Sequence, residues 1–229
     1  MLASFVTAGK ETAKLLAFKT VKIDTQKHGW AFITLAILFA WLAGLGRYWD
    51  HPSAADWQYW GLGSVAYIFV LTTILYLVIW PLKPKRWDWV AILIFIGLTS
   101  PLAWLYAIPV ERFLPAQTAK MLNINFLAIV ALWRVILYVL FLMRYAGLRG
   151  LRLTAAIFMP LVLIIIGLSM LNLEHAIFEV MAGIEQERSE IEDIHDRNYG
   201  TIVLLSVLSF LSLPIWIFIY VLAIIQSRK

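Results

Sequence analysis

Long runs of hydrophobic residues alternate with short polar segments along the whole chain. Six of these runs come close to the roughly 20 residues that a helix needs to cross a bilayer. We predict transmembrane helices at residues 30–46, 61–80, 87–108, 123–144, 154–173 and 201–225. The fold class is therefore an all-α, polytopic integral membrane protein, with one six-span transmembrane helix bundle over residues 30–225.

Small and helix-breaking residues add detail to two of these spans. The first span carries Ala36, Ala40 and Gly44 at every fourth position, a stripe that lets a second helix approach closely. The third span is interrupted at Ser100–Pro101, because proline lacks the backbone N–H that an α-helix uses. We expect close helix packing along the stripe and a break in the third span.

The segment before the first span, residues 1–29, is predicted to be a basic amphipathic helix lying on the cytoplasmic face. Its apolar residues recur at roughly helical spacing, at Leu2, Phe5, Val6, Ala13 and Leu16. Five lysines follow this apolar start or lie within it, at positions 10, 14, 19, 22 and 27. That order is the reverse of a signal peptide. A partly ordered tail is the alternative.

Composition supports the membrane assignment and excludes several kinds of chemical site. Hydrophobic residues make up 62% of the chain and charged residues 14%, with a mean hydropathy of +0.82. The absence of cysteine excludes disulfides, thiol catalysis and cysteine metal sites. The net charge of +5 comes from lysines and arginines beside the spans, which indicates topology and contact with anionic lipid rather than with nucleic acid.

The distribution of these basic residues predicts the orientation. Thirteen Lys and Arg residues fall on one side of the six spans and five on the other. The richer side is expected to be cytoplasmic, and it contains both termini, as an even number of spans requires. We interpret the protein as residing in a bacterial cytoplasmic (inner) membrane.

Arg134 places a charge near the middle of the fourth predicted span, where a charge is costly. The predicted orientation brings hydroxyl groups of the third and sixth spans to the same depth. In addition, Pro101 frees the carbonyl of Gly97. We therefore predict a midplane polar site formed by Gly97, Thr99, Ser100, Arg134 and Ser212.

Three interpretations of Arg134 remain open. Its guanidinium has five donors and does not deprotonate, and no span offers a carboxylate near that depth. It is a structural tether to Gly97 and Ser100, a binding site for a buried anion or polar solute, or a contact with another subunit.

An acidic segment, residues 174–198, follows the fifth span and is expected to form a helical loop outside the membrane. It holds eight carboxylates between Glu174 and Arg197. The weak metal-ligand candidates are Glu174, His175, Glu179, Glu192 and His195. A bridged two-metal site in a helical bundle needs two Glu-x-x-His pairs, and only one is present. A solvated acidic face is favoured, and neither a metal nor another cofactor is expected.

The chain contains no His-Glu-x-x-His motif, P-loop, nucleophile elbow or dinucleotide fingerprint. An enzyme is therefore the least favoured of three hypotheses. The most favoured hypothesis is a non-enzymatic multi-pass membrane protein, a subunit or scaffold of a membrane complex. Its expected partners are the bilayer, anionic lipid at the cytoplasmic face and other membrane proteins. The alternative is a small-solute or ion transporter built around Arg134.

Overall fold

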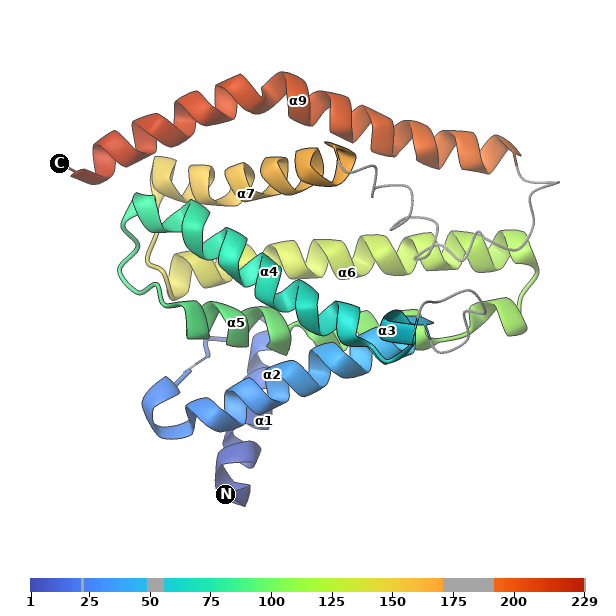
Figure 1. Cartoon of the computed structure of the whole chain (residues 1–229), viewed down its shortest axis with the longest axis horizontal. Helices are drawn as coiled ribbons and strands as arrows, with labels where there is room; N and C mark the ends of the chain where they lie inside the picture. The colour runs from blue at the N-terminus through green and yellow to red at the C-terminus, as the bar shows by residue number, and fades with distance from the viewer. Residues whose placement is uncertain (22, 49–55, 171–191, 229) are drawn as a thin grey trace. The chain divides into compact units, whose positions relative to one another are not determined.

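The computed structural model describes residues 1–21, 23–48, 56–170 and 192–228 (Figure 1). Within these residues every regular element is a helix, and six helices are long and apolar enough to cross a membrane. The predicted all-α, six-span fold class is confirmed. The six candidate spans are Thr25–Gly46, Leu62–Leu82, Trp89–Ala107, Gln117–Arg144, Gly150–Met170 and Leu204–Arg228.

Four of the helices begin before the predicted spans, at Thr25, Ala116, Gly150 and Glu192. The α-helices are α1 Leu2–Leu16, α2 Thr25–Tyr48, α3 Asp56–Tyr59, α4 Leu62–Ile79, α5 Trp89–Leu98, α6 Ala116–Arg144, α7 Gly150–Met170 and α9 Glu192–Arg228. The 3-10 helices are η1 Trp80–Leu82, η2 Ser100–Ala107 and η3 Val110–Arg112. The last part of the predicted acidic loop belongs to the first turns of α9, and residues 174–191 lie outside the described part of the chain.

The third span breaks where the proline predicts it. α5 ends at Leu98, and η2 continues the path from Ser100 with Pro101 near its start. The start of α5 is fixed by Asp88, whose carboxylate accepts the backbone N–H of Ala91 at 2.8 Å. The span is therefore an α-helix followed by a tighter 3-10 segment.

The chain forms two compact units. The first contains Met1–Trp80, Pro84–Pro109 and Ala128–Leu148, and the second Pro81–Lys83, Val110–Leu127 and Arg149–Lys229. In the first unit α2 packs against α4, α5 and η2. All residues of α5 from Ala91 to Leu98 are buried, so α5 is the centre of that unit.

Small residues allow the helices of the first unit to touch at their backbones. A Cβ added to Gly97 would lie 2.5 Å from the Cβ of Ala36, and one added to Gly44 would lie 2.6 Å from the carbonyl oxygen of Gly61. Ala36 and Ala40 have exposed fractions of 0% and 1%. The predicted stripe is confirmed as a helix-packing surface.

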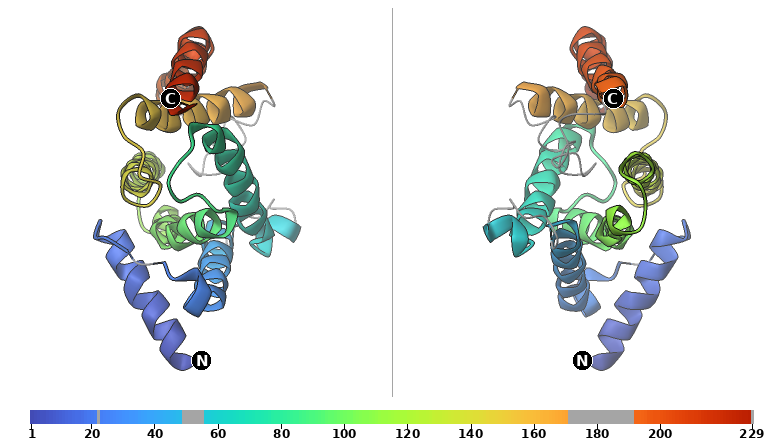
Figure 2. Two further views of the ribbon diagram at one scale, coloured as in Figure 1. Left: turned by 90° about the vertical axis from the view of Figure 1, so that its left-hand side faces the viewer. Right: turned by 90° about the vertical axis from the view of Figure 1, so that its right-hand side faces the viewer.

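In the second unit α7 and α9 lie side by side and run in opposite directions (Figures 1 and 2). Phe158 of α7 stacks on Trp216 of α9, with ring centroids 4.3 Å apart. Ser206, Ser209 and Ala223 of α9 are buried, whereas most of its large apolar side chains are exposed.

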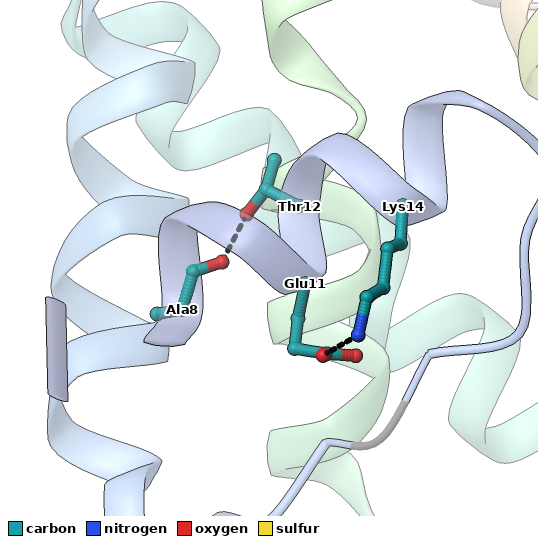
Figure 3. Close-up of polar contacts among 4 residues, drawn as sticks. All are labelled: Ala8, Glu11, Thr12 and Lys14. Atoms are coloured by element: carbon teal, nitrogen blue, oxygen red, sulfur yellow. Dashed lines mark hydrogen bonds and ion pairs between the residues drawn. The ribbon is translucent and has the colours of Figure 1, made fainter. Parts of the chain in front are cut away.

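The N-terminal helix α1 contacts α2 through a buried face that includes Ala8, Thr12 and Leu15. Thr12 donates a hydrogen bond to the carbonyl of Ala8, and Lys14 pairs with Glu11 at 2.5 Å (Figure 3). The helix ends before Lys19, and Lys22 lies outside the described residues. A helix is present in the predicted segment, but it covers only Leu2–Leu16, and the last residues of the segment belong to α2, which begins at Thr25. The basic amphipathic character of the segment stays a prediction.

Candidate functional site

Arg134 lies on the buried face of α6. Its neighbours one turn away on that face, Val130, Leu137 and Tyr138, are all buried. The Nε atom of Arg134 is also buried, and it has no hydrogen-bond partner. A buried donor without a partner is costly, so this atom marks a polar position inside an apolar surface.

The contacts between α5 and α6 give the level of Arg134. Phe141 stacks on Phe95 with centroids 4.2 Å apart, and the Tyr145 hydroxyl donates to Asp88 at 2.7 Å, so the two helices run in opposite directions. Arg134 precedes Phe141 by seven residues, or about 10 Å of helix. The same distance beyond Phe95 reaches the start of η2. By this register, Arg134 is level with the break in the third span.

Two of the predicted neighbours of Arg134 on the third span make contacts elsewhere. Thr99 donates its hydroxyl to Ile96 at 2.7 Å, and Gly97 packs against Ala36 of α2. Thr99 and Ser100 are both buried. The contacts of the described residues do not include a hydrogen bond from Arg134 to Gly97 or Ser100. The tether therefore stays a hypothesis.

Ser212, the fifth predicted member of the midplane site, belongs to the second unit. Its hydroxyl donates to the carbonyl of Ser209 at 3.3 Å, within α9 and next to Pro214. Its observed hydrogen bond is thus local to α9, and its part in a shared site remains a prediction.

The neighbouring Trp133 contacts the end of α1, which the sequence did not predict. Its indole N–H donates to the carbonyl of Leu16 at 3.1 Å, and its ring stacks on Phe18 with centroids 4.8 Å apart. Arg144 also donates to the carbonyl of Phe18, at 2.7 Å. The end of α1 is therefore held by α6. A tryptophan near the middle of an apolar run was the available signal, since tryptophan usually marks span ends.

A second polar cluster joins the start of α5 to the end of α6. Burial, the hydrogen bond to Asp88 and the charge of that carboxylate raise the pKa of Tyr145, and Arg86 acts in the opposite direction. The backbone N–H of Lys85 donates to the carbonyl of Ala146 at 2.8 Å. A tyrosine kept protonated in this way is a hydrogen-bond donor rather than a nucleophile, so we interpret the cluster as a structural clamp.

No group of three or more His, Cys, Asp or Glu side chains that could hold a metal occurs among the residues that the structure describes. Of the weak candidates, Glu174, His175 and Glu179 lie outside those residues. Glu192 and His195 belong to the first turns of α9, where the backbone alone is described. The metal candidates thus remain predictions from sequence.

No family model, no curated protein and no solved structure matches this chain.

Proposed function

We propose that this protein is a non-enzymatic subunit or scaffold of a membrane complex, and that α9 presents its main partner surface. The observation that carries this proposal is the contrast in burial between spans. In their most apolar windows, 11% of the residues of the last span are buried, against 61% for the third span. Within its unit, α9 makes its most extensive contact with α7.

The length of α9 supports the same proposal. The helix runs for 37 residues, or about 55 Å, whereas the hydrocarbon core is about 30 Å thick. Its candidate span begins only at Leu204. The preceding turns, which contain Glu192, Asp193 and Asp196, therefore extend the same helix beyond the hydrocarbon core. One continuous helix offers a partner both an apolar face and a charged extension.

Site-specific photo-crosslinking tests this proposal against simple contact with lipid. A photoreactive residue replaces Leu211 of α9, which is 70% exposed, and in a matched control it replaces Leu132 of α6, which is 64% exposed. We expect a discrete protein adduct from position 211 and lipid adducts from position 132. Lipid adducts alone from both positions would contradict the scaffold.

We also propose that both termini are cytoplasmic, in a bacterial inner membrane, and that basic residues near the N-terminus contact anionic lipid there. The cysteine-free chain allows single cysteines to be introduced at Lys83 and Glu187. In intact cells an impermeant thiol reagent should label position 187 alone, and position 83 should react after permeabilisation. The opposite pattern would reverse the orientation.

The alternative function is a transporter for a small solute or ion, and the buried Nε of Arg134 without a partner favours it. A transporter needs water at this position, whereas a scaffold keeps it dry. Val130→Cys places a thiol on the same buried face, and Leu142→Cys places one at another buried position of α6. Selective reaction of Val130→Cys with a small hydrophilic thiol reagent would make transport the leading hypothesis. Protection of both thiols would support the scaffold.

A further inference from the structure

The second unit contains a cavity of about 460 Å³ where the start of α7 meets the end of α9. Its volume lies in the range of small-ligand pockets. Six residues line it: Arg149, Gly150, Leu151, Arg152, Gln226 and Ser227. Two cationic side chains thus face this cavity, and no acidic residue is among the described residues that line it.

Both arginines are available to a ligand. Among the described residues, neither Arg149 nor Arg152 has an ion pair or hydrogen bond through its guanidinium. A guanidinium group presents a planar set of N–H donors that fits the oxygens of a phosphate. Two of them beside one cavity provide a positive site, and no carboxylate of the described residues pairs with either.

The other lining groups show which donors remain. The amide of Gln226 is an additional donor, and the unpaired backbone N–H groups at the start of the 21-residue helix α7 favour an anion. Ser227 already donates its hydroxyl to the carbonyl of Ile224 at 2.7 Å. The end of α9 carries a partial negative charge, and Arg228 in its last turn offsets that charge.

The cavity lies at the ends of two candidate spans, Gly150–Met170 and Leu204–Arg228. In a bilayer these ends are level with the lipid headgroups. Leu151 adds a partly exposed apolar side chain beside the two arginines. Phosphate chemistry next to an apolar side chain at this level matches a phospholipid better than a soluble phosphate.

We propose that this cavity binds the phosphate group of an anionic phospholipid, with Arg149 and Arg152 as the direct contacts. The site does not depend on the scaffold function, because it uses the C-terminal end of α9, whereas the crosslinking position Leu211 lies near the middle of that helix. Loss of lipid binding with crosslinking retained, or the reverse, would separate the two proposals.

The test uses the full chain in phosphatidylcholine nanodiscs titrated with phosphatidylglycerol, with bound lipid measured by native mass spectrometry. We expect Arg149→Gln and Arg152→Gln each to weaken phosphatidylglycerol binding about tenfold, as loss of a charged hydrogen bond would. Arg228→Gln is the matched control, since it removes one charge from the same end of α9 without lining the cavity. An equal loss in Arg228→Gln would overturn the site in favour of diffuse surface attraction.

Two further measurements test the guanidinium contact and the class of the ligand. Arg152→Lys keeps the charge but loses the planar donors, so binding should fall between wild type and Arg152→Gln. Equal binding by Arg152→Lys and wild type would contradict a direct guanidinium contact. Inorganic phosphate titrated into the same nanodiscs should not displace phosphatidylglycerol at millimolar concentration. Displacement would make a soluble phosphate the ligand and overturn the lipid assignment.

Discussion

Three glycines in the spans of the first unit and one in a span of the second lie in opposite surroundings. In the first unit a Cβ on Gly44, Gly46 or Gly97 would come within 3 Å of a neighbouring helix or turn. In α7 of the second unit, a Cβ on Gly167 would meet no atom within 4 Å. Inside a bilayer the hydrophobic effect does not drive helices together, so close packing of small residues has to drive their association. The first unit is built by such contacts at its glycines. In the second unit, α9 buries the small residues Ser206, Ser209 and Ala223, adds one stacked ring pair with α7 and keeps an exposed face.

The largest effect is expected from Gly97→Leu. The new side chain would start 2.5 Å from the Cβ of Ala36 and 2.8 Å from its carbonyl oxygen, inside α2. Overpacking of this kind costs about 1–3 kcal/mol or more, and α5 is the most buried span. Thermal unfolding in mild detergent should show a clear loss of stability.

Gly167→Leu is the matched control for this prediction. It makes the same substitution in a helix of similar hydropathy, but into open space. Its stability should equal or slightly exceed that of wild type, because leucine favours a helix over glycine. Equal destabilisation by the two substitutions would mean that the units do not differ in how they pack.

A smaller loss is expected from Gly44→Leu. Here the new side chain would meet the backbone of Gly61 and the Cβ of Ser64 within 3 Å. Gly61 has φ +70° and lies in the turn before α4, so this backbone can shift more easily than the interior of α2. We expect a melting temperature between those of Gly97→Leu and wild type. A Gly44→Leu protein that melts like wild type would contradict the close approach.

The spans, the stripe of small residues and the break at Pro101 could all be read from the sequence, because each depends on local pattern. The docking of α1 on α6 could not, since it joins Phe18 to Trp133 across more than a hundred residues. The midplane polar site was predicted only from the depth of its residues in the membrane. Depth cannot tell which side of a helix a residue occupies, so the sequence did not show that Nε of Arg134 lacks a partner.

Trp133→Phe should release the end of α1 with a modest cost. The substitution keeps an aromatic ring against Phe18 but removes the hydrogen bond to the carbonyl of Leu16, worth about 1 kcal/mol. We expect faster hydrogen exchange in α1 with little change in the exchange of α5. Trp104→Phe is the control, because the described contacts of Trp104 include a ring edge with Phe39 and no indole hydrogen bond. Unchanged exchange in α1 would show that the indole hydrogen bond to Leu16 does not hold the end of this helix.

The smallest effect is expected from Tyr145→Phe, and it depends on pH. Near neutral pH the loss of the hydrogen bond to Asp88 should cost about 1 kcal/mol or less, because the group is partly exposed. The pKa of Tyr145 is raised in the folded state, so the folded protein holds this proton more tightly than the unfolded chain. Its stabilising contribution is therefore complete below the ordinary tyrosine pKa of about 10 and decreases as pH rises above that value. Wild type and Tyr145→Phe should converge in melting temperature at alkaline pH. A difference that stays constant from neutral to alkaline pH would show that the Tyr145–Asp88 bond does not perturb this titration.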